Sequence, residues 1–249
     1  SAPYGGGVAN ESGTVILTQS VISGNTATSA GGGVFNYNGY LSIGNGQFAG
    51  NRVVNSGDGG AIWNVTNSQL DINHSTFSLN EAYKGGAIYN SDHSTATISR
   101  TTLDGNEAFT GGAIRNNAGS RLLLSLSTLN NNIALHDGGA IYNDSSAIAP
   151  DVEIVNSTLS YNNANDGSGG AIFNNLGVIA LLNGTLTGNT AAYGGGGLYH
   201  NVANGSLIAR GIVNGNNLEN GRERIDRVLP IVKKYGAAVL SMTIDEDGM

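Results

Sequence analysis

The sequence contains no cysteine, only 3 prolines and a low share of charged residues, 12%. Without cysteine, neither disulfides nor thiol chemistry can hold the fold together or carry a reaction. No apolar run approaches the roughly 20 residues of a transmembrane helix, so we expect no membrane insertion. The basic surface typical of nucleic-acid-binding proteins is not expected either, because the net charge is -7 at pH 7.

Glycine, in contrast, is abundant, with 39 of 249 residues, and it recurs in a fixed phrase. The clearest copy, Gly-Gly-Ala-Ile-Tyr-Asn, occupies residues 85–90. Eight exact or looser copies begin at residues 5, 31, 59, 85, 111, 138, 169 and 195, so successive copies are 26 to 31 residues apart. A constant period in this range is typical of a solenoid.

A second phrase lies between these copies and ends in Asn-x-Ala, for example from Leu70 to Ala82. Asparagine tolerates the left-handed backbone region and often ends strands, so we interpret this asparagine as a turn residue. Its amide could also bond to the equivalent amide of the next coil, which predicts an asparagine ladder. The asparagine recurs eight times, as Asn25, Asn51, Asn80, Asn106, Asn132, Asn162, Asn189 and Asn216.

Alternation of apolar and polar residues appears three times within each period, which indicates three short strands per coil. One position of the Gly-Gly phrase is always aliphatic and must face a core: Val8, Val34, Ile62, Ile88, Ile114, Ile141, Ile172 and Leu198. A single coil cannot bury such a face, so neighbouring coils must stack. The sequence therefore predicts an all-β fold, a right-handed parallel β-helix solenoid of about eight coils, over residues 1–216.

The composition changes abruptly near residue 217. Residues 1–216 hold 18 charged residues, whereas the last 33 residues hold 11. An apolar helical face followed by the buried-strand pattern of 237–244 predicts a short helix-strand C-terminal tail, and Pro230 predicts a bend in this helix or a late start of it. We interpret residues 217–249 as an α/β capping segment or a fused fragment.

In the Gly-Gly phrase, one residue lies between the always-aliphatic position and the asparagine. By strand alternation its side chain should point outward. Six of its eight occurrences are aromatic: Phe35, Trp63, Tyr89, Tyr142, Phe173 and Tyr199. Two interpretations remain open. The row is a stacking platform for sugar rings or a partner surface, or it is an external ladder that stabilises neighbouring strands. These six residues are the candidate ligand-binding residues.

Carboxylates are the side chains that catalysis on polysaccharides or calcium binding would require. Asp58, Asp137 and Asp166 recur near the Gly-Gly turns, but they are not clustered as calcium requires, so we interpret them as solvated turn residues. A glycosidase needs two facing carboxylates. Asp71 and Asp104 occupy different phrase positions and cannot be placed together.

The remaining polar candidates have equally plain interpretations. Asp151 and Glu153 share one strand face and are expected to be a solvated pair. The four histidines are scattered, and His200 replaces the asparagine of the Gly-Gly phrase, where it should satisfy the same turn. The sequence therefore predicts no catalytic residue, no metal site and no cofactor.

The Gly-Gly-Ala-Ile phrase and the phrase Phe77-Ser78-Leu79-Asn80 resemble the paired motifs of polymorphic outer membrane proteins. More broadly, residues 1–216 resemble the β-helical repeats of bacterial surface and secreted proteins with a pectin-lyase-like fold. The resemblance implies adhesion or surface display, and hence a secreted or cell-surface location.

The tail carries a second resemblance, to the pterin-binding barrel of cobalamin-dependent methionine synthase. It rests on the segments 217–221, 224–230, 233–239 and 243–249. Asn217 and Asp245 would match strand-end positions of that family's folate site. The tail corresponds to only one αβ step of an eight-fold barrel, so we infer no methyl transfer.

The function expected from these patterns is a non-catalytic surface or secreted module, a rigid stalk or adhesin that binds carbohydrate or protein through the aromatic row. The alternative is a polysaccharide-active enzyme, a lyase or glycosidase, suggested by fold analogy alone. The sequence starts at Ser1, almost inside a repeat and without a signal peptide or a cap. An uncovered first coil predicts end-to-end self-association or a missing upstream segment.

Overall fold

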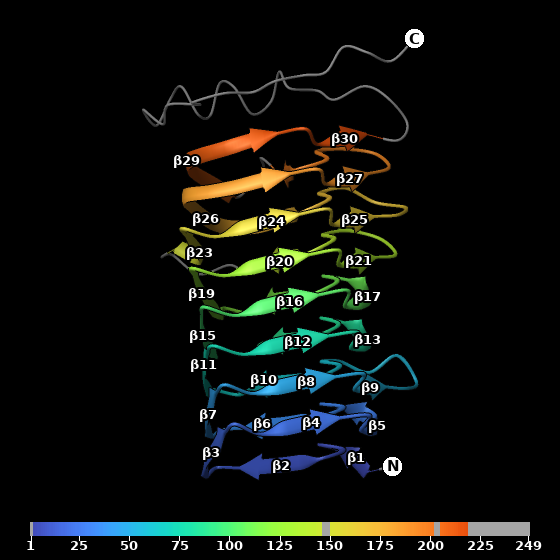
Figure 1. Cartoon of the computed structure of the whole chain (residues 1–249), viewed down its shortest axis with the longest axis vertical. Helices are drawn as coiled ribbons and strands as arrows, with labels where there is room; N and C mark the ends of the chain where they lie inside the picture. Colours follow the sequence, from blue (N-terminus) through green and yellow to red (C-terminus); the bar gives the residue numbers. More distant parts are fainter. Residues whose placement is uncertain (1, 146–149, 202–204, 219–249) are drawn as a thin grey trace.

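A computed structural model describes residues 2–145, 150–201 and 205–218. Over these residues the chain winds into a column of stacked coils, and each coil lies directly on the previous one (Figure 1). All strand pairs are parallel, and no helix occurs in the described part of the chain. It follows that none of these residues form a helix that could cross a membrane.

The strands that carry the Gly-Gly phrase form one face of the column, which we call sheet B. They are β2 (Val8–Glu11), β6 (Val34–Tyr37), β10 (Ile62–Val65), β14 (Ile88–Asn90), β18 (Ile114–Asn117), β22 (Ile141–Asp144), the start of β26 (Ile172–Thr187), and β28 (Leu198–His200).

The next face, sheet C, has two strands per coil. The first set is β3 (Thr14–Thr18), β7 (Tyr40–Gly44), β11 (Gln69–Asn73), β15 (Thr95–Ser99), β19 (Arg121–Ser125) and β23 (Pro150–Val155). The second set is β4 (Val21–Ser23), β8 (Gln47–Ala49), β12 (Thr76–Ser78), β16 (Thr102–Asp104), β20 (Thr128–Asn130) and β24 (Thr158–Ser160). In the last two coils β26 and β29 (Gly205–Asn214) run through both positions.

A third face, sheet A, follows the asparagine of the second phrase. Its strands are β1 (Ala2–Tyr4), β5 (Thr26–Ala30), β9 (Arg52–Val53), β13 (Glu81–Lys84), β17 (Glu107–Thr110), β21 (Ile133–Ala134), β25 (Asn163–Ala164), β27 (Thr190–Ala191) and β30 (Asn217–Leu218). The sequence predicted only three strands per coil and missed this one. The reason is that most of these strands are two to four residues long, too short for a clear alternation.

The core is a set of aliphatic rows that run along the axis. Ile62 pairs in register with Ile88, and Ile88 with Ile114, and all three side chains are fully buried. Leu70 and the ring of Phe77 line the same interior from sheet C. The predicted right-handed parallel β-helix of about eight coils is therefore confirmed over the described residues.

Two asparagine ladders run inside the column. In one, the amide of Asn80 donates to the Oδ1 of Asn106 at 2.9 Å, and the backbone N–H of Asn80 donates to the same oxygen at 3.1 Å. Its members are the eight asparagines of the second phrase, from Asn25 to Asn216. The predicted ladder is confirmed, and a second one joins the asparagines of the Gly-Gly phrase from Asn10 to Asn174.

The interpretation of these asparagines as left-handed turn residues is wrong. The positive φ falls one residue earlier, for example at Leu79 (φ 54°) and Gly105 (φ 63°), and the ladder asparagines are not among the positive-φ residues. The asparagine instead supports the bend from inside, since the amide of Asn80 also donates to the carbonyl of Phe48. Its role is hydrogen bonding rather than backbone conformation.

The sequence predicts that the β-helix repeats end at residue 216 and that the C-terminal tail begins at residue 217. Sheet A continues to β30, where Asn217 pairs with Thr190 of β27. The structure describes only residues 217 and 218 of the predicted tail. The expected helix and strand fall after residue 218 and lie outside the described residues.

Candidate functional site

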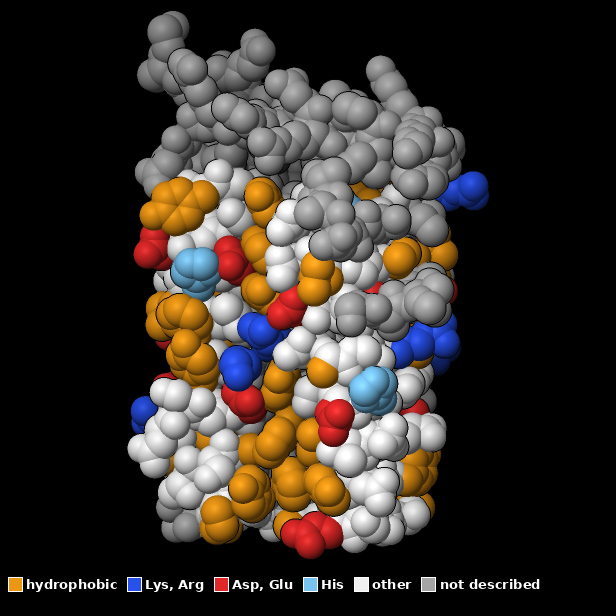
Figure 2. Space-filling view, turned by 180° about the vertical axis from the view of Figure 1, so that it is seen from behind, with side chains coloured by type: hydrophobic (Ala, Val, Ile, Leu, Met, Phe, Trp, Pro, Cys, Tyr) orange, Lys and Arg blue, Asp and Glu red, His pale blue; other side chains and the backbone are white. Residues whose placement is uncertain are grey.

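The predicted aromatic row lies on the outer face of sheet B. Phe35 pairs in register with Trp63, and Trp63 with Tyr89, with ring centroids 5.3 and 6.3 Å apart. Higher in the column, Phe173 stacks between Tyr142 and Tyr199 at 4.9 and 5.2 Å. Figure 2 shows this face, on which hydrophobic side chains form a stripe along the axis of the column. The parallel register thus brings all six predicted residues into one row.

The row is only partly exposed, which corrects the expectation of an exposed aromatic surface. Phe35 and Tyr89 are each 6% exposed and Phe173 is 9% exposed, whereas the other three rings are half-buried. The rings cover one another, and Tyr4 of β1 stacks on Phe35 at 5.0 Å. Three of the six rings are therefore covered by their neighbours, and the other three keep part of their surface accessible.

A cation interrupts the row at Arg115, between Tyr89 and Tyr142. Its guanidinium lies 4.2 Å from the centroid of the Tyr142 ring, a favourable cation–π geometry. The same group forms an ion pair with Asp144 at 3.4 Å, and the arginine is largely buried. Arg115 also donates to the hydroxyl of Thr110 at 2.6 Å. The arginine thus continues the stack with a charged plane.

A second ion pair lies beside the row. The carboxylate of Asp58 is 3.6 Å from the ammonium of Lys84, which sits 5.8 Å from the Tyr89 ring. Burial raises the pKa of the Asp58 carboxyl, and the nearby Lys84 charge opposes this shift. Asp58 is therefore not the solvated turn residue that the sequence predicted.

The other two turn aspartates are also engaged. Asp137 accepts the backbone N–H of Ser168 at 2.8 Å and lies 2.7 Å from Nδ1 of His136. Asp166 accepts the hydroxyl of Tyr193 at 2.6 Å. All three aspartates therefore join neighbouring residues or coils. The described residues hold no group of three or more potential metal ligands.

The remaining acidic candidates are also held by neighbours. Asp71 accepts the Tyr40 hydroxyl at 2.9 Å, and Asp104 accepts the side-chain amides of Asn130 and Asn131.

Asp151 and Glu153 are not the solvated pair that the sequence predicted. Asp151 is buried at 1% exposure and accepts the backbone N–H of Val178 at 2.9 Å. Glu153 instead pairs with Arg121 of the preceding coil at 3.4 Å. The strand register shifts between Pro150 and Val152, so simple alternation fails at this point.

His200 takes the place of the last asparagine of the Gly-Gly ladder. Its Nδ1 lies 2.9 Å from Nδ2 of Asn174. Because an amide nitrogen can only donate, Nδ1 accepts this bond. The structure thus agrees with the interpretation that this histidine satisfies the same turn.

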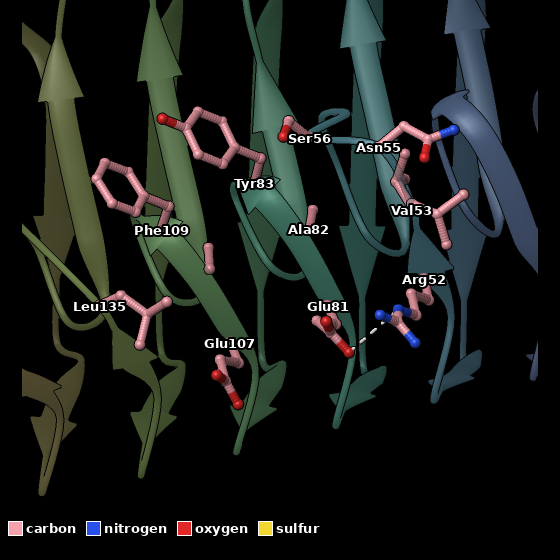
Figure 3. Close-up of a pocket in the computed structure, with 12 residues that line it drawn as sticks. Arg52, Val53, Asn55, Ser56, Glu81, Ala82, Tyr83, Glu107, Phe109 and Leu135 are labelled. Carbon is pink, nitrogen blue, oxygen red and sulfur yellow. Dashed lines mark ion pairs between the residues drawn. The ribbon is translucent and has the colours of Figure 1, made fainter.

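A hollow of about 490 Å³ lies on the outer face of sheet A. Figure 3 shows Tyr83 and Phe109 on one side of it, and Arg52, Glu81 and Glu107 on the other. Val53, Ala82 and Ala108 lie between the two sides, the loop at 54–56 forms one end, and Leu135 forms the other. The hollow therefore crosses several coils along the axis.

The aromatic side of the hollow is open to solvent. The rings of Tyr83 and Phe109 are 4.9 Å apart and nearly parallel, at 8°, and Phe109 continues the stack to His136 at 5.6 Å. Tyr83 is 39% exposed, Phe109 37% and Leu135 47%. Each ring therefore still offers apolar surface.

The charged side of the hollow is only partly neutralised. Arg52 and Glu81 form an exposed ion pair at 3.4 Å. Glu81 stands in register with Glu107 of the next coil. Among the described residues, no hydrogen bond or ion pair engages the Glu107 carboxylate. The hollow therefore has one carboxylate available for a ligand.

The averaged repeat pattern does not predict this hollow. Its signal is the triplet Glu-Ala-aromatic, which occurs at 81–83 and again at 107–109. A second signal is the extra length of the coil at 52–58, which provides the loop at one end. Both features are confined to adjacent coils, so they are absent from a pattern averaged over eight repeats.

Comparison with known families gives one finding. The model of the Chlamydia polymorphic membrane protein repeat matches residues 74–91 and 127–144. Each segment runs from β12 or β20 through sheet A to β14 or β22, and it contains one asparagine of each ladder. The matches cover well under half of the chain. No curated protein and no solved structure gives a significant match.

The repeat match and the solenoid together fit a bacterial surface β-helix repeat protein. The family of the matched repeat is associated with the bacterial outer membrane or surface, in agreement with the location expected from the sequence. No finding supports the resemblance of residues 217–249 to the pterin-binding barrel.

Proposed function

We propose that this chain is a non-catalytic module displayed on the bacterial cell surface or secreted from it. It acts as a rigid stalk or adhesin and binds carbohydrate or protein through the aromatic row of sheet B. The observation that carries this proposal is the in-register alignment of six aromatic rings on one outer face.

The scaffold supports such a role because it fixes the rings before a ligand arrives. Each coil adds a rise of about 4.8 Å, so equivalent side chains are regularly spaced along the axis. The buried ladders and the aliphatic core leave little freedom to the backbone between them. A preorganised surface loses less conformational entropy on binding than a flexible one.

The accessible part of the row is centred on Trp63, Tyr142 and Tyr199, the half-buried rings. Trp63 donates its indole N–H to the Ser91 hydroxyl at 3.3 Å, which orients the ring. Aromatic side chains anchored in this way are frequent hot spots of recognition surfaces. They are the first residues to test.

A glycan array and a protein overlay with the double variant Trp63→Ala, Tyr142→Ala test this proposal. We expect at least a tenfold loss of affinity for whichever ligand the wild type binds. The control is Tyr161→Ala, which removes a 65% exposed ring from another face and should leave binding unchanged. Equal binding by the double variant and the wild type would exclude the row as the site.

Lyase and glycosidase assays on polysaccharides test the alternative function. We expect no turnover above background. Turnover that disappears when a single carboxylate is replaced by its amide would instead show an enzyme of the pectin-lyase-like fold.

A further inference from the structure

We propose that the hollow on sheet A is a second binding site, separate from the aromatic row of sheet B, and that it takes a saccharide unit bearing a protonated amino group. The proposal rests on three features of the hollow: a stacked aromatic side, a carboxylate that no described residue pairs with, and polar groups at one end.

The aromatic side matches the apolar face of a sugar ring. The rings of Tyr83 and Phe109 are stacked with nearly parallel planes, and more than a third of each residue stays exposed. The C–H groups of a pyranose face pack on such surfaces, and the negative ring face also attracts a nearby cation. The ring pair would therefore help to bind both the apolar ring face and the charged amino group of an amino sugar.

The opposite side supplies the counter-charge. Glu81 is already paired with Arg52 at 3.4 Å, whereas the Glu107 carboxylate has no ion-pair partner among the described residues. A cation beside Glu107 would face Phe109, which lies two residues along the same strand. The net charge of -7 adds a long-range attraction for cations.

The polar end of the hollow favours a sugar over a lysine side chain. Asn55 and Ser56 line this end of the hollow, and Figure 3 shows Ser56 beside Tyr83 and Asn55 near Val53. Both residues have positive φ, 59° and 61°, which gives the loop its tight bend. These two side chains and the Arg52 guanidinium can bond to several hydroxyl groups at once, whereas the single ammonium group of a lysine side chain cannot engage Glu107 and all three of them together.

The spacing of the coils favours an oligosaccharide over a single sugar. Tyr83 and Phe109 belong to adjacent coils, which are about 4.8 Å apart, close to the length of one pyranose unit. Successive units of an extended chain would therefore meet successive rings. We expect a trimer to bind more tightly than the monosaccharide.

Isothermal titration calorimetry of the full chain with a glucosamine trimer tests the proposal. Glu107→Gln keeps the shape of the side chain and removes its charge, and we expect at least a tenfold increase in Kd. The matched control is Glu153→Gln, which removes one negative charge from sheet C, away from the hollow. This variant should change Kd less than twofold. Thermal unfolding should be unchanged for Glu107→Gln, because the carboxylate has no ion pair or hydrogen bond to any described residue, and nearly unchanged for Glu153→Gln, which loses one partly exposed ion pair.

Three further outcomes would overturn the proposal. Equal affinity for the N-acetylated trimer would show that the amino group is not recognised. Tighter binding of a lysine tripeptide would assign the hollow to a basic peptide. If Trp63→Ala weakens trimer binding and Glu107→Gln does not, the ligand binds the row of sheet B and the hollow is not its site.

Discussion

The outer faces of sheets A and B both carry stacked aromatic rings, yet the two rows differ in what covers them. Phe35 and Tyr89 of sheet B are 6% exposed, whereas Tyr83 and Phe109 of sheet A are 39% and 37% exposed. The inter-coil register is the same in both. In the row of sheet B, however, a ring from another strand adds cover, since Tyr4 of β1 stacks on Phe35 at 5.0 Å. Lys84, in contrast, lies near a ring of each row, 5.8 Å from Tyr89 and 6.0 Å from Tyr83.

The comparison shows that the rings stack because the repeat places equivalent residues in register. Their exposure to solvent, in contrast, depends on the side chains that happen to lie beside each ring. A ring that its neighbours cover contributes mainly to stability, because burial of apolar area stabilises the fold. A ring that they leave open is available for a ligand. The experiments below separate these two contributions.

The largest effect is expected for Gly86→Val, which removes the register on which both rows depend. A Cβ at this position would collide with the backbone carbonyl oxygen of Gly112 in the next coil. We expect the solenoid not to fold, as measured by circular dichroism. The control is Gly119→Val, at φ +72°, where a Cβ would meet only the side chain of His93. This variant should fold and lose about 1–3 kcal/mol.

The next effect is expected for Asn106→Leu, inside the column beneath both faces. The change leaves the backbone N–H of Asn80 and the carbonyl of Phe77 without their buried partner. Each of these two orphaned groups costs about 1–3 kcal/mol, so urea unfolding should show a loss of roughly 2–6 kcal/mol. Asn25→Leu, near the end of the same ladder and half-buried, should cost clearly less. Equal costs would show that the ladder stabilises the middle of the column no more than its end.

A matched pair of ring deletions tests the comparison directly. Trp63→Ala should cost about 2 kcal/mol, because its ring packs on Phe35 and Tyr89. Phe109→Ala should cost less than about 1 kcal/mol, because much of its ring already faces water. Urea unfolding of the two variants provides the measurement. The reverse order would mean that the row of sheet A is the structural one.

The smallest effect is a pH dependence at Asp58. Burial raises the folded-state pKa of this carboxyl above its ordinary value of 3.8. The stability that its protonated form contributes is fully present below that value and is lost as the pH rises through the raised pKa. The free energy of unfolding of the wild type, relative to Asp58→Asn, should therefore fall from below pH 3.8 to pH 7. A pH-independent difference would contradict the assignment.

Lys84→Met sharpens the same experiment. The Lys84 charge lowers the pKa of Asp58 and so opposes the effect of burial. Its removal should extend the fall in stability to higher pH. The measurement is the same difference between variants with and without Asp58→Asn.

The interior of this protein could be predicted from the sequence because every coil repeats it. The aliphatic position at Ile62, Ile88 and Ile114 and the asparagines of the second phrase recur in register, so one pattern describes all coils. The six residues of the aromatic row were placed correctly on one outer face for the same reason. Their burial was not predicted, because it depends on side chains from other strands, such as Tyr4.

Features confined to one or two coils could not be found in this way. The hollow on sheet A is lined by the loop at 54–56 and by both Glu-Ala-aromatic triplets. The repeat pattern does not predict that these segments occur in neighbouring coils. The burial of Asp151 depends on a register shift at Pro150, where the alternation of the strand is interrupted. Such irregularities do not recur from coil to coil, so a repeat pattern cannot predict them. They become visible only in the three-dimensional structure.

The direction of the inter-coil hydrogen bonds also determines how the column responds to force. The sheet ladders and both asparagine ladders run along the long axis, so the interfaces between coils are arranged in series. Tension applied along this axis acts on every interface with the same force, so the weakest interface should yield first and the coils should separate one after another. Compression and bending, in contrast, are shared by the whole cross-section, which suits a structure that holds its tip away from its base.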